Sequence, residues 1–148
     1  MGSRIESAVV INRPVEEVFG FFLNLDENAP RVDPGLLSVV RSPDGPTEAG
    51  TTFRFRQKML GRPRETTTRF VSIEPNRKIE FQAFLGPIRP TAVLTFERAD
   101  TGTKVHFSAE ANPVGPFRLL SPLMKRKGQH EWDQRLVRVK TVLEASGS

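Results

Sequence analysis

The stretch that decides the fold is Phe53-Arg54-Phe55-Arg56-Gln57-Lys58-Met59. Successive side chains of a β-strand point to opposite faces, so this run predicts a strand with two phenylalanines and a methionine on one face. Its three cations then lie on the other face. Repeated over several strands, the same alternation builds a sheet with one apolar face and one solvated face.

Six more segments predict strands around this one, which runs from Thr51 to Met59. They are Arg4–Ile11, Leu36–Arg41, Arg64–Ile73, Lys78–Phe84, Thr91–Arg98 and Thr103–Ala111. Turn signals such as Pro43-Asp44-Gly45-Pro46 and Asp100-Thr101-Gly102 separate neighbouring strands. Such short connections predict an antiparallel sheet. Between residues 64 and 73 the apolar positions change face after Phe70, which predicts a β-bulge.

Two further regions have the spacing of helices. The first follows Pro14, which suits the first helical position, and runs for about ten residues. Its apolar positions are Val15, Val18, Phe19, Phe22 and Leu23. The segment Asp26–Gly35 holds two prolines and predicts a short helix or a turn.

The second helical region is long and lies near the C-terminus. Ser121 suits the N-cap and Pro122 the first position, so the helix is predicted over Pro122–Ala145, with a length of about 36 Å. Its apolar stripe, extended to the preceding turn, is Phe117, Leu120, Met124, Gly128, Trp132, Leu136, Val139 and Leu143. Glu131 precedes Arg135 by four residues and predicts a surface ion pair. Strands segregated from helices indicate an α+β fold.

Composition narrows the class of protein. We expect residues 1–148 to form one domain, with no disulfide or thiolate site because the chain has no cysteine. No apolar run approaches the roughly 20 residues of a membrane span and no signal peptide is evident, so we expect a cytoplasmic protein. The net charge of +5 raises nucleic acid or anionic membrane as partners. Glutamates among the outward arginines predict ion pairs on a solvated surface instead, and we expect no nucleic-acid partner.

Three segments carry a resemblance to a known family. They are Ile11-Asn12-Arg13-Pro14-Val15-Glu16-Glu17-Val18-Phe19, the stretch Glu97–Val105 with its hairpin, and Leu136–Glu144. With this order of elements, the chain resembles the START-like superfamily, also called the SRPBCC, helix-grip or Bet v 1-like fold. Within it, the chain is similar to the polyketide cyclase/dehydrase and lipid-transport group. Relatives often have Trp where this chain has Phe19.

The resemblance implies a seven-stranded curved antiparallel sheet wrapped around the long C-terminal helix, with two short helices between the first two strands. It also implies an apolar cavity between sheet and helix. Members of the superfamily bind lipids, sterols, polyketides or plant hormones, and some cyclise polyketides. The family has no universal catalytic motif, so it implies no catalytic residue here.

Strand parity and the helical stripe together predict the ligand-binding residues. They are Phe53, Phe55, Gln57, Thr66, Thr68, Phe70, Phe81, Leu94, Phe96 and Phe107 from the sheet, with Phe117, Met124 and Trp132 from the helical segment. Gln57 and the two threonines would orient the ligand, because binding pockets are apolar with a few polar groups. The alternative is that the same side chains fill a solid core. Small inward residues such as Ala83, Ala92 and Gly128 favour unfilled volume.

Residue types that carry catalysis or bind metals are sparse. His130-Glu131 begins a zinc-protease pattern, but the next ligand position holds Gln134, and the chain has only two histidines. His106 should face solvent, and His130 is the near-neutral base that could approach a cavity mouth. Tyrosine, phosphate-binding glycine loops and nucleophile-elbow serines are absent. We therefore predict no metal, no cofactor and no catalytic residue.

Three functions stay open from the sequence. The first is a non-catalytic binder or carrier of a hydrophobic small molecule such as a lipid, polyketide or aromatic compound, in a monomer or weak homodimer. The second is a polyketide cyclase/dehydratase, which needs a proton-transfer group such as His130 or Glu80 in the cavity. The third is an interaction module for protein, membrane or RNA. Its basic surface would be formed by Arg54, Arg56, Lys58, Arg62, Arg64 and Arg69.

Overall fold

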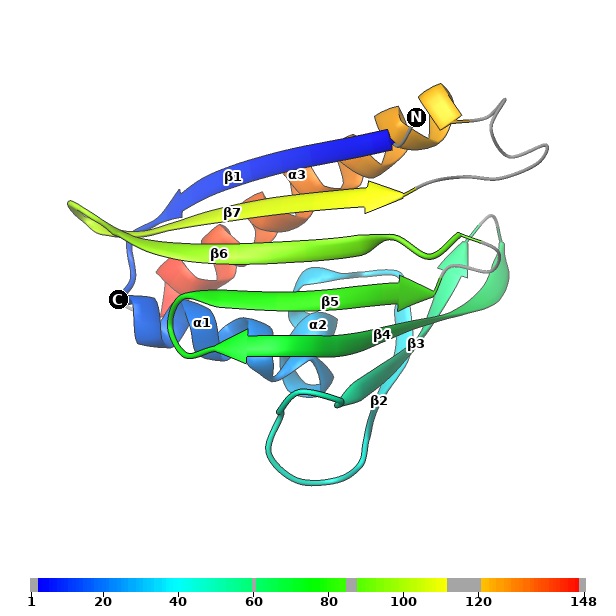
Figure 1. Cartoon of the computed structure of the whole chain (residues 1–148), viewed down its shortest axis with the longest axis horizontal. Coiled ribbons are helices and arrows are strands. Elements are labelled where there is room, and N and C mark those ends of the chain that lie inside the picture. Colours follow the sequence, from blue (N-terminus) through cyan, green and yellow to red (C-terminus); the bar gives the residue numbers. More distant parts are fainter. Residues whose placement is uncertain (1–2, 60, 85–87, 112–120, 147–148) are drawn as a thin grey trace.

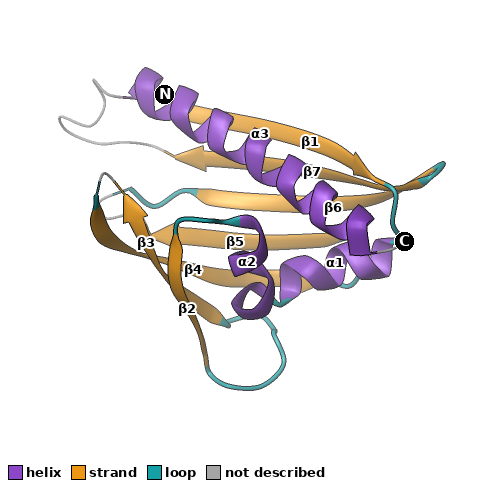
Figure 2. Ribbon diagram, turned by 180° about the vertical axis from the view of Figure 1, so that it is seen from behind, coloured by secondary structure: helices purple, strands orange, loops and turns teal. Residues whose placement is uncertain are grey.

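Seven antiparallel strands form one curved sheet, and the helices lie on one of its faces (Figures 1 and 2). The computed structural model describes residues 3–59, 61–84, 88–111 and 121–146. The strands follow the order β1-β7-β6-β5-β4-β3-β2. The elements are β1 (Ser3–Ile11), α1 (Val15–Leu23), α2 (Leu25–Val32), β2 (Leu36–Ser42), β3 (Thr52–Met59), β4 (Arg62–Glu74), β5 (Lys78–Phe84), β6 (Thr91–Ala99), β7 (Gly102–Ala111) and α3 (Ser121–Ser146). The predicted α+β helix-grip fold is confirmed.

The predicted strand parity holds across the sheet. In β6, Ala92, Leu94 and Phe96 are buried, and in β7 Val105 and Phe107 are buried, while the residues between them are more exposed. The register pairs inward positions with inward positions, as in Leu94 with Phe107. Because one face of each strand is apolar, a slip of one residue would expose the whole set, and the pattern therefore specifies the register.

The predicted bulge in β4 is also present, and its geometry corrects one assignment. The pairing with β5 shifts between Phe70 and Ser72, which leaves Val71 as the extra residue. Val71 is 53% exposed, whereas Ile73 pairs with Ile79 and packs against the core. The sequence placed Ile73 on the same face as Val71, but the bulge returns it to the inward face.

Helices α1 and α2 cover one end of the inward face. Phe19 and Phe22 of α1 lie with ring centroids 5.2 Å and 5.7 Å from that of Phe96. Pro14 is the N-cap of α1, one position before the predicted one. The segment read as a short helix or turn overlaps α2, which ends at Val32 because the next residue, Asp33, precedes Pro34 and has an extended backbone.

Helix α3 packs unevenly along its length. Leu136, Val139 and Leu143, in its C-terminal half, are almost fully buried. Toward the N-terminus the helix carries exposed side chains, and Leu123 is 66% exposed. The C-terminal half of α3 therefore packs into the core near α1. The N-terminal half lies over the sheet without packing into the core, and Figure 2 shows the path of the helix.

Polar side chains of α3 fix the helix along the edge strand β1. The side chain of Gln129 pairs with both backbone groups of Glu6, accepting from its N–H at 3.1 Å and donating to its carbonyl. The Ser7 hydroxyl donates to Asp133 Oδ1 at 2.5 Å. The two Gln129 bonds occupy backbone groups of Glu6 that would otherwise form part of an open sheet edge.

Nearer the C-terminus, two α3 side chains hold the end of β1. Lys140 Nζ donates to the Val10 carbonyl at 2.7 Å, and Glu144 Oε2 accepts from the Asn12 N–H at 2.9 Å. Lys140 and Glu144 also form a salt bridge at 2.7 Å. Two hydrogen bonds to the Glu144 carboxylate lower its pKa. The bond from Lys140 has the larger effect, and the bond from the Asn12 backbone N–H has the smaller one. The carboxylate form is thus the one that the folded chain stabilises.

Gly102, at the start of β7, should tolerate no side chain. A Cβ there would lie 2.0 Å from the Ile11 carbonyl oxygen and 2.8 Å from the Asn12 Cα. We expect Gly102→Ala to lower the free energy of unfolding by about 2 kcal/mol or more, because the clashing atoms are backbone. Gly20→Ala is the control, since a Cβ at Gly20 meets nothing within 4 Å. Equal urea midpoints for the two variants would contradict the close packing of β7 on the end of β1.

Glu144 should make stability depend on pH. Its folded pKa lies below its ordinary value of 4.5, so its contribution is present above that value and is lost as pH falls through the folded pKa. We expect Glu144→Gln to melt below the wild type at about pH 7, and this gap to close as the pH falls through the folded pKa of Glu144. Glu97→Gln, at an exposed strand position, serves as the control. A pH-independent gap would show that the charge of Glu144 is not responsible.

Candidate functional site

A pocket of about 650 Å³ lies between the inward face of the sheet and the helices. Its size falls within the roughly 300–1,000 Å³ of small-molecule sites. Nine of the thirteen predicted ligand-binding residues line it. They are Phe55, Gln57, Thr66, Thr68, Phe70, Phe81, Leu94, Phe107 and Trp132. Ala83, Ala92, Ala109 and Gly128 also line it, and their small size leaves the volume open.

Two predicted residues belong to the core beside the pocket. Phe53 is fully buried, and its ring centroid lies 5.2 Å from that of Phe70 and 6.5 Å from that of Phe55. Phe96 is covered by the α1 phenylalanines. Neither lines the pocket, so strand parity identified the correct face but not the open part of it. Phe117 and the Met124 side chain lie outside the described residues.

An aromatic row crosses the pocket from strand to strand and reaches α3. The ring centroids of Phe70 and Phe81 are 6.2 Å apart, and those of Phe81 and Phe107 are 6.3 Å apart. Phe107 stacks on Trp132 at 3.6 Å with an interplanar angle of 11°. The row gives the pocket a continuous apolar wall that joins the sheet to the helix.

Sequence reasoning missed the contribution of the first two helices. Phe21, Phe22 and Leu25 line the pocket, as do Val32 and Asp33 at the end of α2. The apolar spacing of residues 15–23 was visible, but it shows only that the helix has a buried face. Which buried side chains reach a cavity depends on where the helix crosses the sheet.

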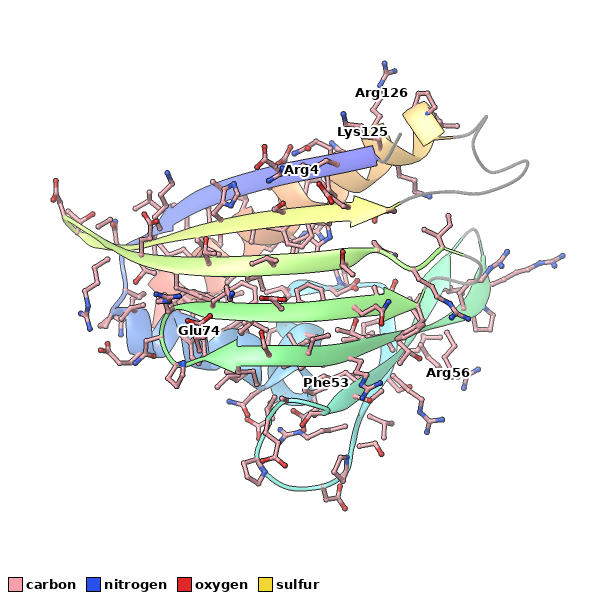
Figure 3. All side chains as sticks on the ribbon, in the orientation of Figure 1. Arg4, Phe53, Arg56, Glu74, Lys125 and Arg126 are labelled. Carbon is pink, nitrogen blue, oxygen red and sulfur yellow. The ribbon has the colours of Figure 1, made fainter. Side chains whose placement is uncertain are left out.

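Charged side chains gather where the pocket meets solvent. Arg64, Glu65, Lys125 and Glu131 line it and are exposed, so they mark its rim. Glu65 is one of the glutamates predicted at outward strand positions, and it is exposed but lies at this rim. Figure 3 shows Lys125 and Arg126 pointing outward from the start of α3.

Arg135 differs from the charged residues of the rim. It lines the pocket but is only partly exposed, and its guanidinium carbon lies 4.7 Å from the Trp132 ring centroid. Burial lowers the pKa of Arg135 below its ordinary value, although the Asp33 and Glu131 carboxylates oppose the shift. Glu131 attracts Arg135, as the sequence predicted, but the two form no salt bridge, and both line the pocket instead of a plain solvent-facing surface.

The two bases considered for catalysis lie away from the pocket. His130 is exposed and is not part of the lining, and Glu80 forms a 2.9 Å salt bridge with Lys78. His106 lies on the outer face, 3.5 Å from a carboxylate oxygen of Glu6. The six basic residues of the proposed interaction surface are exposed, and their role stays a prediction. Within the described residues, no three His, Asp or Glu side chains gather as a metal site.

A family model described as polyketide cyclase/dehydrase and lipid transport matches residues 3–144. The chain belongs to this family. The match spans nearly the whole chain, so the resemblance seen in three short motifs is confirmed. The comparison with curated proteins finds no match. In the described part of the chain, no helix is long and apolar enough to cross a membrane.

Solved structures share the fold at low identity. Ara h 8.0201 is 17% identical, with a TM-score of 0.78, and 97% of this chain covers 99% of it. TTHA0849 from Thermus thermophilus is 17% identical, with a TM-score of 0.80, and 98% of this chain covers 99% of it. The di-domain ARO/CYC StfQ of the steffimycin biosynthetic pathway is 16% identical, with a TM-score of 0.81. All of this chain matches 53% of StfQ, so the likeness covers about half of that protein.

Proposed function

We propose that this protein binds or carries a hydrophobic small molecule in the pocket between the sheet and α3. The observation that supports this most is the continuous aromatic wall from Phe70 to Trp132 around a volume of about 650 Å³. Such a surface gains free energy when an apolar ligand displaces water from it. Membership of a family described by polyketide chemistry and lipid transport agrees with this proposal.

The pocket offers enough apolar surface for useful affinity. Micromolar binding requires about 8 kcal/mol. At about 25 cal/mol per Å², this corresponds to burying roughly 330 Å² of apolar surface before ordering costs. A medium-length acyl chain or a fused-ring compound presents surface of this order. Binding in the micromolar range is therefore the expected result.

The chain contains its own reporter of binding. Trp132 is the single tryptophan and tyrosine is absent, so intrinsic fluorescence comes from the pocket wall. We expect lipids and fused-ring aromatic compounds to change Trp132 emission with saturation at micromolar concentration. Displacement of a hydrophobic dye by the same compounds gives an independent measurement. If none of them competes at tens of micromolar, the proposal fails.

A matched pair of variants tests whether binding occurs in the pocket. Ala83 lines the pocket, whereas its neighbour Gln82 points to the outer face. We expect Ala83→Phe to fill part of the volume and weaken binding about tenfold or more, while Gln82→Phe leaves affinity within about twofold. Melting temperatures show that both variants fold. Equal affinities would place the ligand elsewhere on the protein.

A cyclase remains a second candidate, because carboxylates face the same pocket. Asp33 and Glu131 line it next to Arg135, so proton-transfer groups are present although His130 and Glu80 are not. Cyclisation of a poly-ketone could then combine substrate folding with acid–base help. Incubation with a linear poly-ketone thioester should yield a dehydrated cyclic product. Wild-type rates in Asp33→Asn and Glu131→Gln, measured by mass spectrometry, would remove this candidate.

A further inference from the structure

Arg135 places a partly buried cation in the pocket, with apolar side chains and the carboxylates of Asp33 and Glu131 around it. The residue after it, Leu136, is fully buried, and Val139, one turn further, is 1% exposed. The guanidinium of Arg135 lies against Trp132, which is the last ring of the aromatic row. Arg135 thus lies at the position that one end of a ligand would occupy if the ligand lay along the aromatic row.

The guanidinium of Arg135 has N–H donors that can bind a ligand. An arginine carries five N–H donors and stays charged in proteins. Among the described residues, none forms a salt bridge with Arg135 or accepts a hydrogen bond from it, and Trp132 contacts it through its ring. Asp33 and Glu131 are the carboxylates that interact with it at longer range. Asp33 already accepts the Gly35 N–H at 3.1 Å.

We propose that the pocket selects a singly charged amphiphile, an apolar chain or ring system with one carboxylate, and that Arg135 binds this carboxylate. The inference rests on the proposed function of the pocket and names the chemical class of its ligand. The apolar body would lie along Trp132, Phe107 and Phe81. The guanidinium fork matches a carboxylate with two parallel hydrogen bonds, which a ligand alcohol or ester cannot form.

The neighbouring carboxylates set the charge of the ligand. Asp33 and Glu131 lie near enough to Arg135 to interact with its charge, so they also repel a negative headgroup, and they repel a doubly charged one more strongly than a singly charged one. A carboxylate is therefore preferred over a phosphate monoester, which carries close to two charges at neutral pH. A ligand amine is disfavoured because the donors of Arg135 would face it.

Dye displacement by four compounds with the same twelve-carbon chain tests the proposal. They are dodecanoate, dodecanol, dodecylamine and dodecyl phosphate. We expect dodecanoate to bind best to the wild type. Arg135→Gln should weaken dodecanoate about tenfold to a hundredfold, the usual value of hydrogen bonds to a charged group, and change dodecanol less than about threefold. Arg135→Lys, which keeps the charge without the fork, should fall between the two.

Arg138→Gln is the matched control, since Arg138 lies on the same helix, is exposed and does not line the pocket. It removes the same charge and should leave all four affinities unchanged. Equal binding of dodecanoate and dodecanol, preference for the amine or phosphate, or an equal loss in Arg138→Gln overturns the assignment of Arg135 while leaving the pocket intact. If no compound displaces the dye from a folded wild-type protein, the proposed function fails as well.

Discussion

The docking of α3 along the edge strand β1 is the constraint on which the rest of the structure depends. Gln129 pairs with the backbone of Glu6 as a neighbouring strand would, and Lys140 and Glu144 repeat the attachment at the far end. The helix is therefore held at the border of the sheet along its length. An apolar helix free to settle on the centre of the sheet would instead bury the aromatic face and close the pocket.

The pocket exists because the two ends of α3 are packed differently. Leu136, Val139 and Leu143 join the core beneath α1, whereas the N-terminal half carries charged and exposed side chains. Beneath that half, alanines on three strands leave space where larger residues would meet the helix. Trp132 stands at the transition and bridges the gap by stacking on Phe107. A filled interior would bury more apolar surface, so the open volume lowers the stability of the fold.

The charged side chains of the outer sheet face and those at the pocket have different surroundings. On the outer face, lysines and arginines meet glutamates across and along strands, as Lys78 does with Glu74 and Glu80. Such exposed pairs contribute little free energy each, and their main effect is a solvated surface. Where a charge at the pocket is partly buried, its interactions are stronger than those of the exposed rim and outer face. Arg135 is the clearest case, since its environment is partly apolar and its nearest contact is an aromatic ring.

The sequence by itself determined the strands, their parity, the bulge after Phe70 and the long terminal helix. These follow from periodicities of two and of three to four residues, which are local properties of the chain. The tertiary structure alone decided which inward residues face open space. Phe53 and Phe55 share one face of β3, yet Phe53 is sealed by its neighbours and Phe55 lines the pocket. Arg135 likewise had the spacing of a surface residue, and only the path of α3 past α2 turned it inward. Periodicity specifies a face, whereas a cavity depends on distances between elements that the chain brings together only when it folds.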